Sequence, residues 1–119
     1  MDSFYRIKQI EKISHQHYRF SVTLVEHLVY EGHFPGNPVM PGVCSLQMVA
    51  ECAGKTLGYP VYINYIHIVK FLGIIRPSFD NELEIDLIFD DEMLLKATIK
   101  SSERMVMSCK MNLKKMNNR

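Results

Sequence analysis

Residues 32–42 read GHFPGNPVMPG, and residues 43–57 continue directly as VCSLQMVAECAGKTL. The first segment holds three of the six glycines and three of the five prolines of the chain. Proline removes a backbone hydrogen-bond donor and glycine raises the entropy cost of ordering, so this segment cannot sustain a helix or a central strand. It is predicted to form a shaped loop.

The segment after the loop has the composition of a helix. It lacks proline, is rich in Ala, Leu and Met, and is closed by Gly58, a residue type that commonly ends helices. Its apolar positions cover nearly the whole circumference, which predicts a central helix from Val43 to about Leu57 that is wrapped by other structure. The polar exceptions recur every four residues and therefore share one narrow stripe: Gln47, Glu51 and Lys55.

The rest of the chain is rich in residues typical of strands. Residues 18–25 read YRFSVTLV, a β-branched and aromatic run that predicts a strand, whereas residues 5–13 fit either a strand or a helical turn. Beyond residue 61, apolar runs separated by turn-forming segments predict three or four antiparallel strands, drawn from 61–73, 81–91, 94–101 and 104–113. One apolar helix among about five strands is covered only if the sheet curls around it, so we expect a single α+β domain over residues 1–119.

Composition limits the classes of function. The 14 Lys and Arg residues nearly balance the 13 Asp and Glu residues, and this net charge of +1 gives no reason to expect a nucleic-acid partner. No stretch reads as a signal sequence or approaches the roughly 20 apolar residues of a membrane-spanning helix, so we expect a cytoplasmic protein without a membrane partner. The three cysteines lack CxxC spacing and are expected to be reduced and buried, without a metal or other cofactor: Cys44, Cys52 and Cys109.

The segment GHFPGNPVMPG, leading into a buried helix, resembles the signature of the 3-hydroxyacyl-acyl carrier protein dehydratases. The likeness is detailed over residues 32–54 and continues as a pattern in residues 69–83, VKFLGIIRPSFDNEL. This resemblance implies a hot-dog fold, in which a curled antiparallel sheet wraps around one central helix. It also implies an acyl carrier protein as the partner that delivers the substrate, and a dimer whose active sites lie at the subunit interface.

The resemblance implies that His33 is the base that removes the proton next to the thioester carbonyl. Imidazole suits this role because it titrates near neutral pH. Gly42 matches the residue whose backbone N–H stabilises negative charge on the thioester oxygen, with the helix dipole behind it. Phe34, Pro41 and Val43 are expected to complete the substrate-binding residues.

The family's acidic residue, which assists departure of the β-hydroxyl, is absent from its usual position. It lies fourteen residues after the histidine, where this chain has Gln47, and Glu51 follows one turn later. An amide donates hydrogen bonds but cannot act as a general acid near pH 7. Three interpretations follow: Glu51 replaces the acid, Gln47 orients the hydroxyl while His33 moves both protons, or catalysis is lost. A structural role for Glu51, paired with Lys55, is a further alternative.

The leading hypothesis is dehydration of a 3-hydroxyacyl thioester to the trans-2-enoyl thioester, in fatty acid synthesis or a related polyene or polyketide pathway. The alternatives are a hot-dog acyl thioesterase and a non-catalytic acyl-binding subunit of a heterodimeric dehydratase. We expect a homodimer or higher homo-oligomer, or a heterodimer with a paralogue. Because carrier proteins are acidic, Lys70 and Arg76 are predicted to contribute to a basic docking surface.

Overall fold

The computed structural model describes residues 3–31, 36–91 and 93–117. These residues form six strands, one α-helix and one turn of 3-10 helix. In chain order the elements are β1 (Tyr5–Lys12), β2 (His17–Leu24), η1 (Leu28–Glu31), α1 (Gly42–Leu57), β3 (Val61–Phe71), β4 (Glu82–Phe89), β5 (Leu94–Ser101) and β6 (Arg104–Lys115).

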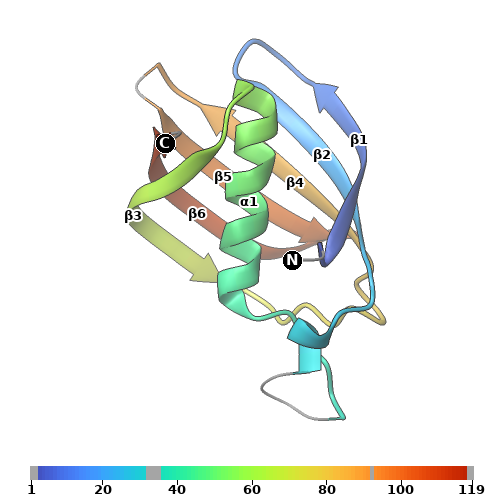
Figure 1. The fold of residues 1–119 in the computed structure, drawn as a ribbon. Coiled ribbons are helices and arrows are strands. Elements are labelled where there is room, and N and C mark those ends of the chain that lie inside the picture. The colour runs from blue at the N-terminus through green and yellow to red at the C-terminus, as the bar shows by residue number, and fades with distance from the viewer. Residues whose placement is uncertain (1–2, 32–35, 92, 118–119) are drawn as a thin grey trace.

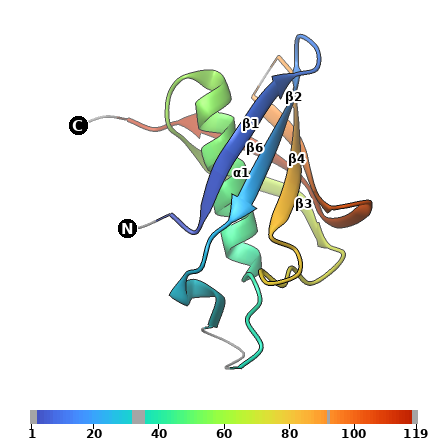
Figure 2. The same ribbon diagram turned by 90° about the vertical axis from the view of Figure 1, so that its right-hand side faces the viewer.

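The strands make one antiparallel sheet in the order β1-β2-β4-β5-β6-β3. Consecutive strands β4, β5 and β6 form a meander, whereas the chain crosses from β2 to the far edge at β3 through the helix. Figure 1 shows the sheet curling around α1, and Figure 2 shows the helix lying against one side of the sheet. This arrangement is the hot-dog fold, and β1 and β3 are its edge strands.

The predicted elements correspond closely to those observed. Helix α1 begins at Gly42, one residue earlier than expected, and ends at Leu57. Gly58 caps it with a left-handed backbone (φ 86°), and its N–H donates to the carbonyl of Gly54. The ambiguous segment near the N-terminus is strand β1, which raises the number of strands in the described residues from the expected five or so to six.

The core lies between the concave face of the sheet and one face of α1. Strands β4 and β5 alternate buried and more exposed residues, as expected for a sheet with one covered face. The expectation that α1 is covered on nearly every side is wrong for this chain alone, because the sheet reaches only one side of the helix. Val43 is 69% exposed, and Glu51 and Lys55 are also exposed, whereas the buried helix residues are Cys44, Ser45, Met48, Val49, Cys52 and Ala53.

Candidate functional site

The last residues of the predicted loop form backbone hydrogen bonds with two other segments just before α1 begins. The N–H of Val39 donates to the carbonyl of Tyr30 in η1, and the N–H of Met40 donates to the carbonyl of Ile75, in the segment after β3; both distances are 2.9 Å. These two bonds fix where the loop meets the helix. The predicted site residues His33 and Phe34 lie outside the described residues.

Gly42 begins α1 at a point of close packing. The residue before it, Pro41, has an extended backbone and no side-chain acceptor with which to cap the first helical amides. A Cβ atom at Gly42 would lie 2.8 Å from Cζ of Phe71, so a larger residue would have to displace this ring. Phe71 is itself 53% exposed. The predicted binding residues Pro41 and Gly42 are half-buried, with the solvent-facing ring of Phe71 against Gly42, whereas Val43 is exposed.

An apolar hollow of about 420 Å³ lies beside Gly42. Ser45 contributes a hydroxyl that is almost completely buried and donates to Sδ of Met40 over 3.4 Å. A concave site with mostly apolar walls and few polar groups suits an acyl chain with one reactive end. The lining residues are Val39, Met40, Gly42, Ser45, Phe71, Gly73, Ile74, Ile75 and Val106.

The polar stripe of α1 is organised by a residue from β1. The Tyr5 hydroxyl donates to Oε1 of Glu51 over 2.5 Å, and Nε2 of Gln47 donates to Oε2 of the same carboxylate over 3.0 Å. Burial, reinforced by the bond to Glu51, raises the pKa of Tyr5 far above its usual range, so its phenol remains a proton donor.

The alternative in which Glu51 pairs with Lys55 is not observed in the described part of the chain. The carboxylate of Glu51 turns to Gln47 and Tyr5 instead. The reason is geometric, since β1 brings a buried phenol to Glu51 from the side of the helix, and a phenol held in place loses less entropy than an exposed lysine. Sequence reasoning missed Tyr5, because no local pattern in residues 5–13 reports a contact 46 positions away.

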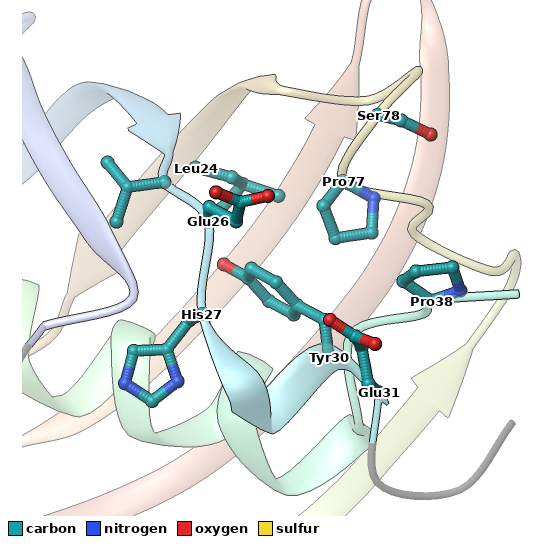
Figure 3. Close-up of a pocket in the computed structure, with 9 residues that line it drawn as sticks. Leu24, Glu26, His27, Tyr30, Glu31, Pro38, Pro77 and Ser78 are labelled. Carbon is teal, nitrogen blue, oxygen red and sulfur yellow. The ribbon is translucent and has the colours of Figure 1, made fainter. Parts of the chain in front are cut away.

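A second hollow, of about 240 Å³, lies between η1, the end of β2 and the segment after β3 (Figure 3). Its walls include the carboxylates of Glu26 and Glu31 and the ring of Tyr30. The Tyr30 hydroxyl is buried and donates to the carbonyl of Phe4 over 2.6 Å, and burial raises the pKa of this phenol. His27 is occupied as an acceptor, with Nδ1 receiving the N–H of Val29 over 3.0 Å. These contacts hold in place the segment that precedes residues 32–42, the signature loop.

The cysteines are free and buried, as predicted. Burial raises the pKa of the Cys44 thiol, and it raises those of Cys52 and Cys109 to about 12 and about 11. None of the three is therefore a thiolate at neutral pH. Within residues 3–31, 36–91 and 93–117, no group of His, Cys, Asp and Glu side chains is placed to hold a metal ion, and the helix is too short to cross a membrane.

Comparison with known proteins places the chain in a family. The family model for ApeI-like proteins, described as ApeI dehydratase, matches residues 9–110. Two curated relatives are 3-hydroxyacyl-[acyl-carrier-protein] dehydratases FabZ. The protein from Pediococcus pentosaceus is 36% identical over 75 residues, which cover 57% of this chain and 50% of the relative. The protein from Ligilactobacillus salivarius is 38% identical over 74 residues, which cover 56% and 52%. The chain thus spans about half the length of the curated relatives it matches.

Solved structures share the fold. The dehydratase heterocomplex ApeI:P from Xenorhabdus doucetiae contains a chain that matches with a TM-score of 0.78 and 24% identity, covering 91% of this chain and 96% of that one. A hypothetical thioesterase with coenzyme A from Streptococcus pneumoniae matches with a TM-score of 0.65 and 14% identity, covering 97% and 88%. At these identities the likeness concerns the fold, but the family model covers most of the chain. This protein belongs to the ApeI-like dehydratase family.

Proposed function

We propose that the protein dehydrates a 3-hydroxyacyl thioester, carried on an acyl carrier protein, to the trans-2-enoyl thioester. The observation that carries this proposal is the junction of the signature loop with α1, where Gly42 begins the helix beside an apolar hollow. The uncapped first turn offers backbone N–H groups and the positive end of the helix dipole to a thioester oxygen. The hollow has the lining that an acyl chain requires.

In this proposal His33 moves the proton. Its imidazole takes the proton from the carbon next to the thioester carbonyl, while negative charge on the carbonyl oxygen is stabilised at the N–H of Gly42. The electron pair of that C–H bond forms the new double bond as the bond between Cβ and the hydroxyl oxygen breaks. The departing hydroxide takes the proton back from the imidazolium and leaves as water.

Gln47, in the position of the family's acid, would orient the departing hydroxyl. One N–H of its amide donates to Glu51, which leaves the other N–H and the carbonyl oxygen for a substrate. The alternative in which Glu51 is the acid is less favoured, because both of its carboxylate oxygens accept hydrogen bonds from neighbouring donors. We therefore propose that Glu51 supports Gln47 and does not itself protonate the hydroxyl.

The partner surface proposed for this protein is the edge strand β3. This strand carries exposed apolar side chains on an unpaired edge, an arrangement that favours pairing with another chain. A second copy would give a homodimer, and the ApeI:P heterocomplex from the Xenorhabdus relative makes a paralogue the alternative. Lys70 on this strand and Arg76 in the segment after it are exposed, and both remain proposed contacts for an acidic carrier protein. The exposed large apolar residues of β3 are Tyr62, Tyr65, Ile66, Ile68 and Phe71.

The decisive experiment is incubation of the purified protein with 3-hydroxyacyl and enoyl carrier-protein thioesters, followed by mass spectrometry of the acyl chain. Loss or gain of water with the thioester intact supports a dehydratase, whereas thioester cleavage alone would make the protein a thioesterase. If the protein is inactive alone but active with a co-expressed paralogue, the subunit alternative holds.

His33→Ala should abolish this water loss, because it deletes the proposed base. We expect turnover to fall by about 10²–10⁴-fold, the range typical of acid–base catalysis, without a change in the thermal unfolding midpoint. The matched control is His15→Ala, in the exposed turn between β1 and β2, which should retain full activity. Survival of activity within about tenfold in His33→Ala would contradict the assignment of the base.

A further inference from the structure

We infer that Tyr5 is a positioning residue, which acts through Glu51 to fix the orientation of the Gln47 side-chain amide. This inference rests on the proposed function and deepens it, because Gln47 occupies the position of the family's acid. The chain of contacts runs from Tyr5, the first residue of strand β1, to helix α1. Each of its two hydrogen bonds ends on a different oxygen of the same carboxylate.

The first link is rigid. Tyr5 is only 6% exposed, and its ring packs against Phe4 with ring centroids 5.1 Å apart. Its backbone is held by pairing with Leu24 of β2 and by the hydroxyl of Ser3, which donates to the Tyr5 carbonyl over 2.7 Å. In this packed setting the hydroxyl oxygen of Tyr5 points toward Glu51.

The direction of each hydrogen bond follows from the chemistry of the groups. The Tyr5 phenol stays protonated and donates, and an ionised carboxylate only accepts. Oε2 of Glu51 can therefore receive only the NH₂ end of Gln47, which determines which way the amide faces. With one N–H of Nε2 held against Glu51, the second N–H and the carbonyl oxygen of Gln47 take no part in this bond and are left for a substrate.

Without Tyr5 this orientation would be lost. Glu51 is an exposed residue on a helix surface, and hydrogen bonds between exposed side chains four residues apart contribute only a few tenths of a kcal/mol. Arg6 and Lys55 line the same shallow hollow as Tyr5 and Glu51, so they are the cations available to draw the carboxylate away. Tyr5 supplies the buried anchor that keeps Glu51 on Gln47.

The test uses Tyr5→Phe, which removes the hydroxyl but keeps the packed ring. If turnover requires an oriented Gln47, kcat for dehydration should fall by about 3- to 10-fold, the loss expected for one hydrogen bond, with KM unchanged. Tyr18→Phe, which removes a hydroxyl from a half-buried tyrosine on β2, should leave kcat unaltered. In a Gln47→Ala background, Tyr5→Phe should have no further effect, because the group it positions is gone. An equal loss in both backgrounds would mean a merely structural role and overturn the inference.

A second measurement does not depend on activity. In ¹⁵N-labelled protein, the side-chain NH₂ signal of Gln47, assigned by its loss in Gln47→Glu, should report an ordered amide in the wild type and a mobile one in Tyr5→Phe. Equal mobility of this amide in both proteins would overturn the inference. An inactive wild type that shows the expected change in mobility would instead contradict the proposed dehydratase while leaving the contact chain intact.

Discussion

Asp80 is a buried carboxylate that fastens the segment after β3 to the turn between β5 and β6. It accepts hydrogen bonds from the N–H of Arg76 at 2.8 Å, the hydroxyl of Ser101 at 2.6 Å and Nη2 of Arg104 at 2.8 Å. Burial by itself would raise the pKa of Asp80, but these donors outweigh it and hold the pKa below its usual range. The segment that supplies Ile75 to the candidate site is therefore stabilised by the ionised carboxylate.

Asp80→Asn should lower the free energy of unfolding by about 1–3 kcal/mol at pH 7, because three donors, among them the buried Ser101 hydroxyl, lose a charged acceptor. Since the folded-state pKa is depressed, the stabilisation is present above the unfolded pKa of about 3.9 and is lost as the pH falls through the folded value. Urea unfolding of both proteins between pH 7 and pH 3 should show the difference shrinking in acid. Glu103→Gln, in the exposed turn nearby, should show no comparable pH-dependent loss. A difference that is constant with pH would contradict this account.

At the scale of single residues, the polar stripe of α1 could be predicted from the sequence, but its hydrogen bond to Tyr5 could not. The four-residue spacing of Gln47 and Glu51 predicted that they share a face, and their hydrogen bond confirms it. The contact with Tyr5 could not be predicted, because it depends on the path of an edge strand relative to the helix and not on local spacing. The catalytic roles of His33, Gln47 and Glu51 remain predictions.

Among the elements, α1 and the end of β3 are coupled at one point, where the ring of Phe71 lies over Gly42. A methyl group at Gly42 would meet this ring at 2.8 Å, although alanine is the better helix former. Packing and helix propensity therefore act in opposite directions at this position. The balance decides how Gly42→Ala affects stability.

Gly42→Ala should be stabilising only when the ring is absent. In a Phe71→Ala background we expect a gain of at most about 0.5–1 kcal/mol from helix propensity, the value for a helix interior, because Gly42 is the first residue of α1. In the wild-type background the clash should offset or exceed that gain. The coupling free energy from the double-mutant cycle, measured by denaturant unfolding, should be about 0.5–3 kcal/mol. Additive effects in the two backgrounds would show that the ring swings away at no cost.

The sequence predicted the bounds of helix α1 accurately but did not identify strand β1. The helix could be located within one residue, because a proline-rich loop precedes it and Gly58 ends it. Strand β1 could not be distinguished from a helical turn, because beyond Tyr5 it is largely exposed and lacks the alternation that marks a half-covered strand. The four strands after residue 61 were separated correctly by their turn-forming segments.

For the whole molecule, the curled sheet around one helix followed from the sequence, because one strongly apolar helix had to be covered by strands. The strand order could not be derived in this way, since the crossover from β2 to the far edge depends on how the helix lies across the sheet. That crossover places β3 at an edge, and part of α1 is left uncovered by the described residues.

If β3 is the subunit interface, Ile66→Glu should weaken self-association by placing an unpaired charge within it. Sedimentation equilibrium at micromolar concentration should show a shift from dimer to monomer. Ile10→Glu makes the same change on β1, the other edge strand, where Ile10 is 50% exposed, and should leave the dimer intact. If both substitutions dissociate the dimer equally, or if only Ile10→Glu does so, the assignment of the interface to β3 is wrong.

Both edge strands of the sheet are irregular. Strand β3 changes register between Ile63 and Tyr65 and again between Ile66 and Ile68, and β1 does so between Ile7 and Gln9. A bulge interrupts the row of N–H and C=O groups and increases the local twist. Continuous stacking of identical strands requires flat, uninterrupted rows of these groups, so the bulges disfavour fibre growth from either edge while still allowing β3 to pair with one partner strand. Even concentrated preparations should therefore stop growing at small closed assemblies and remain free of amyloid-type precipitation.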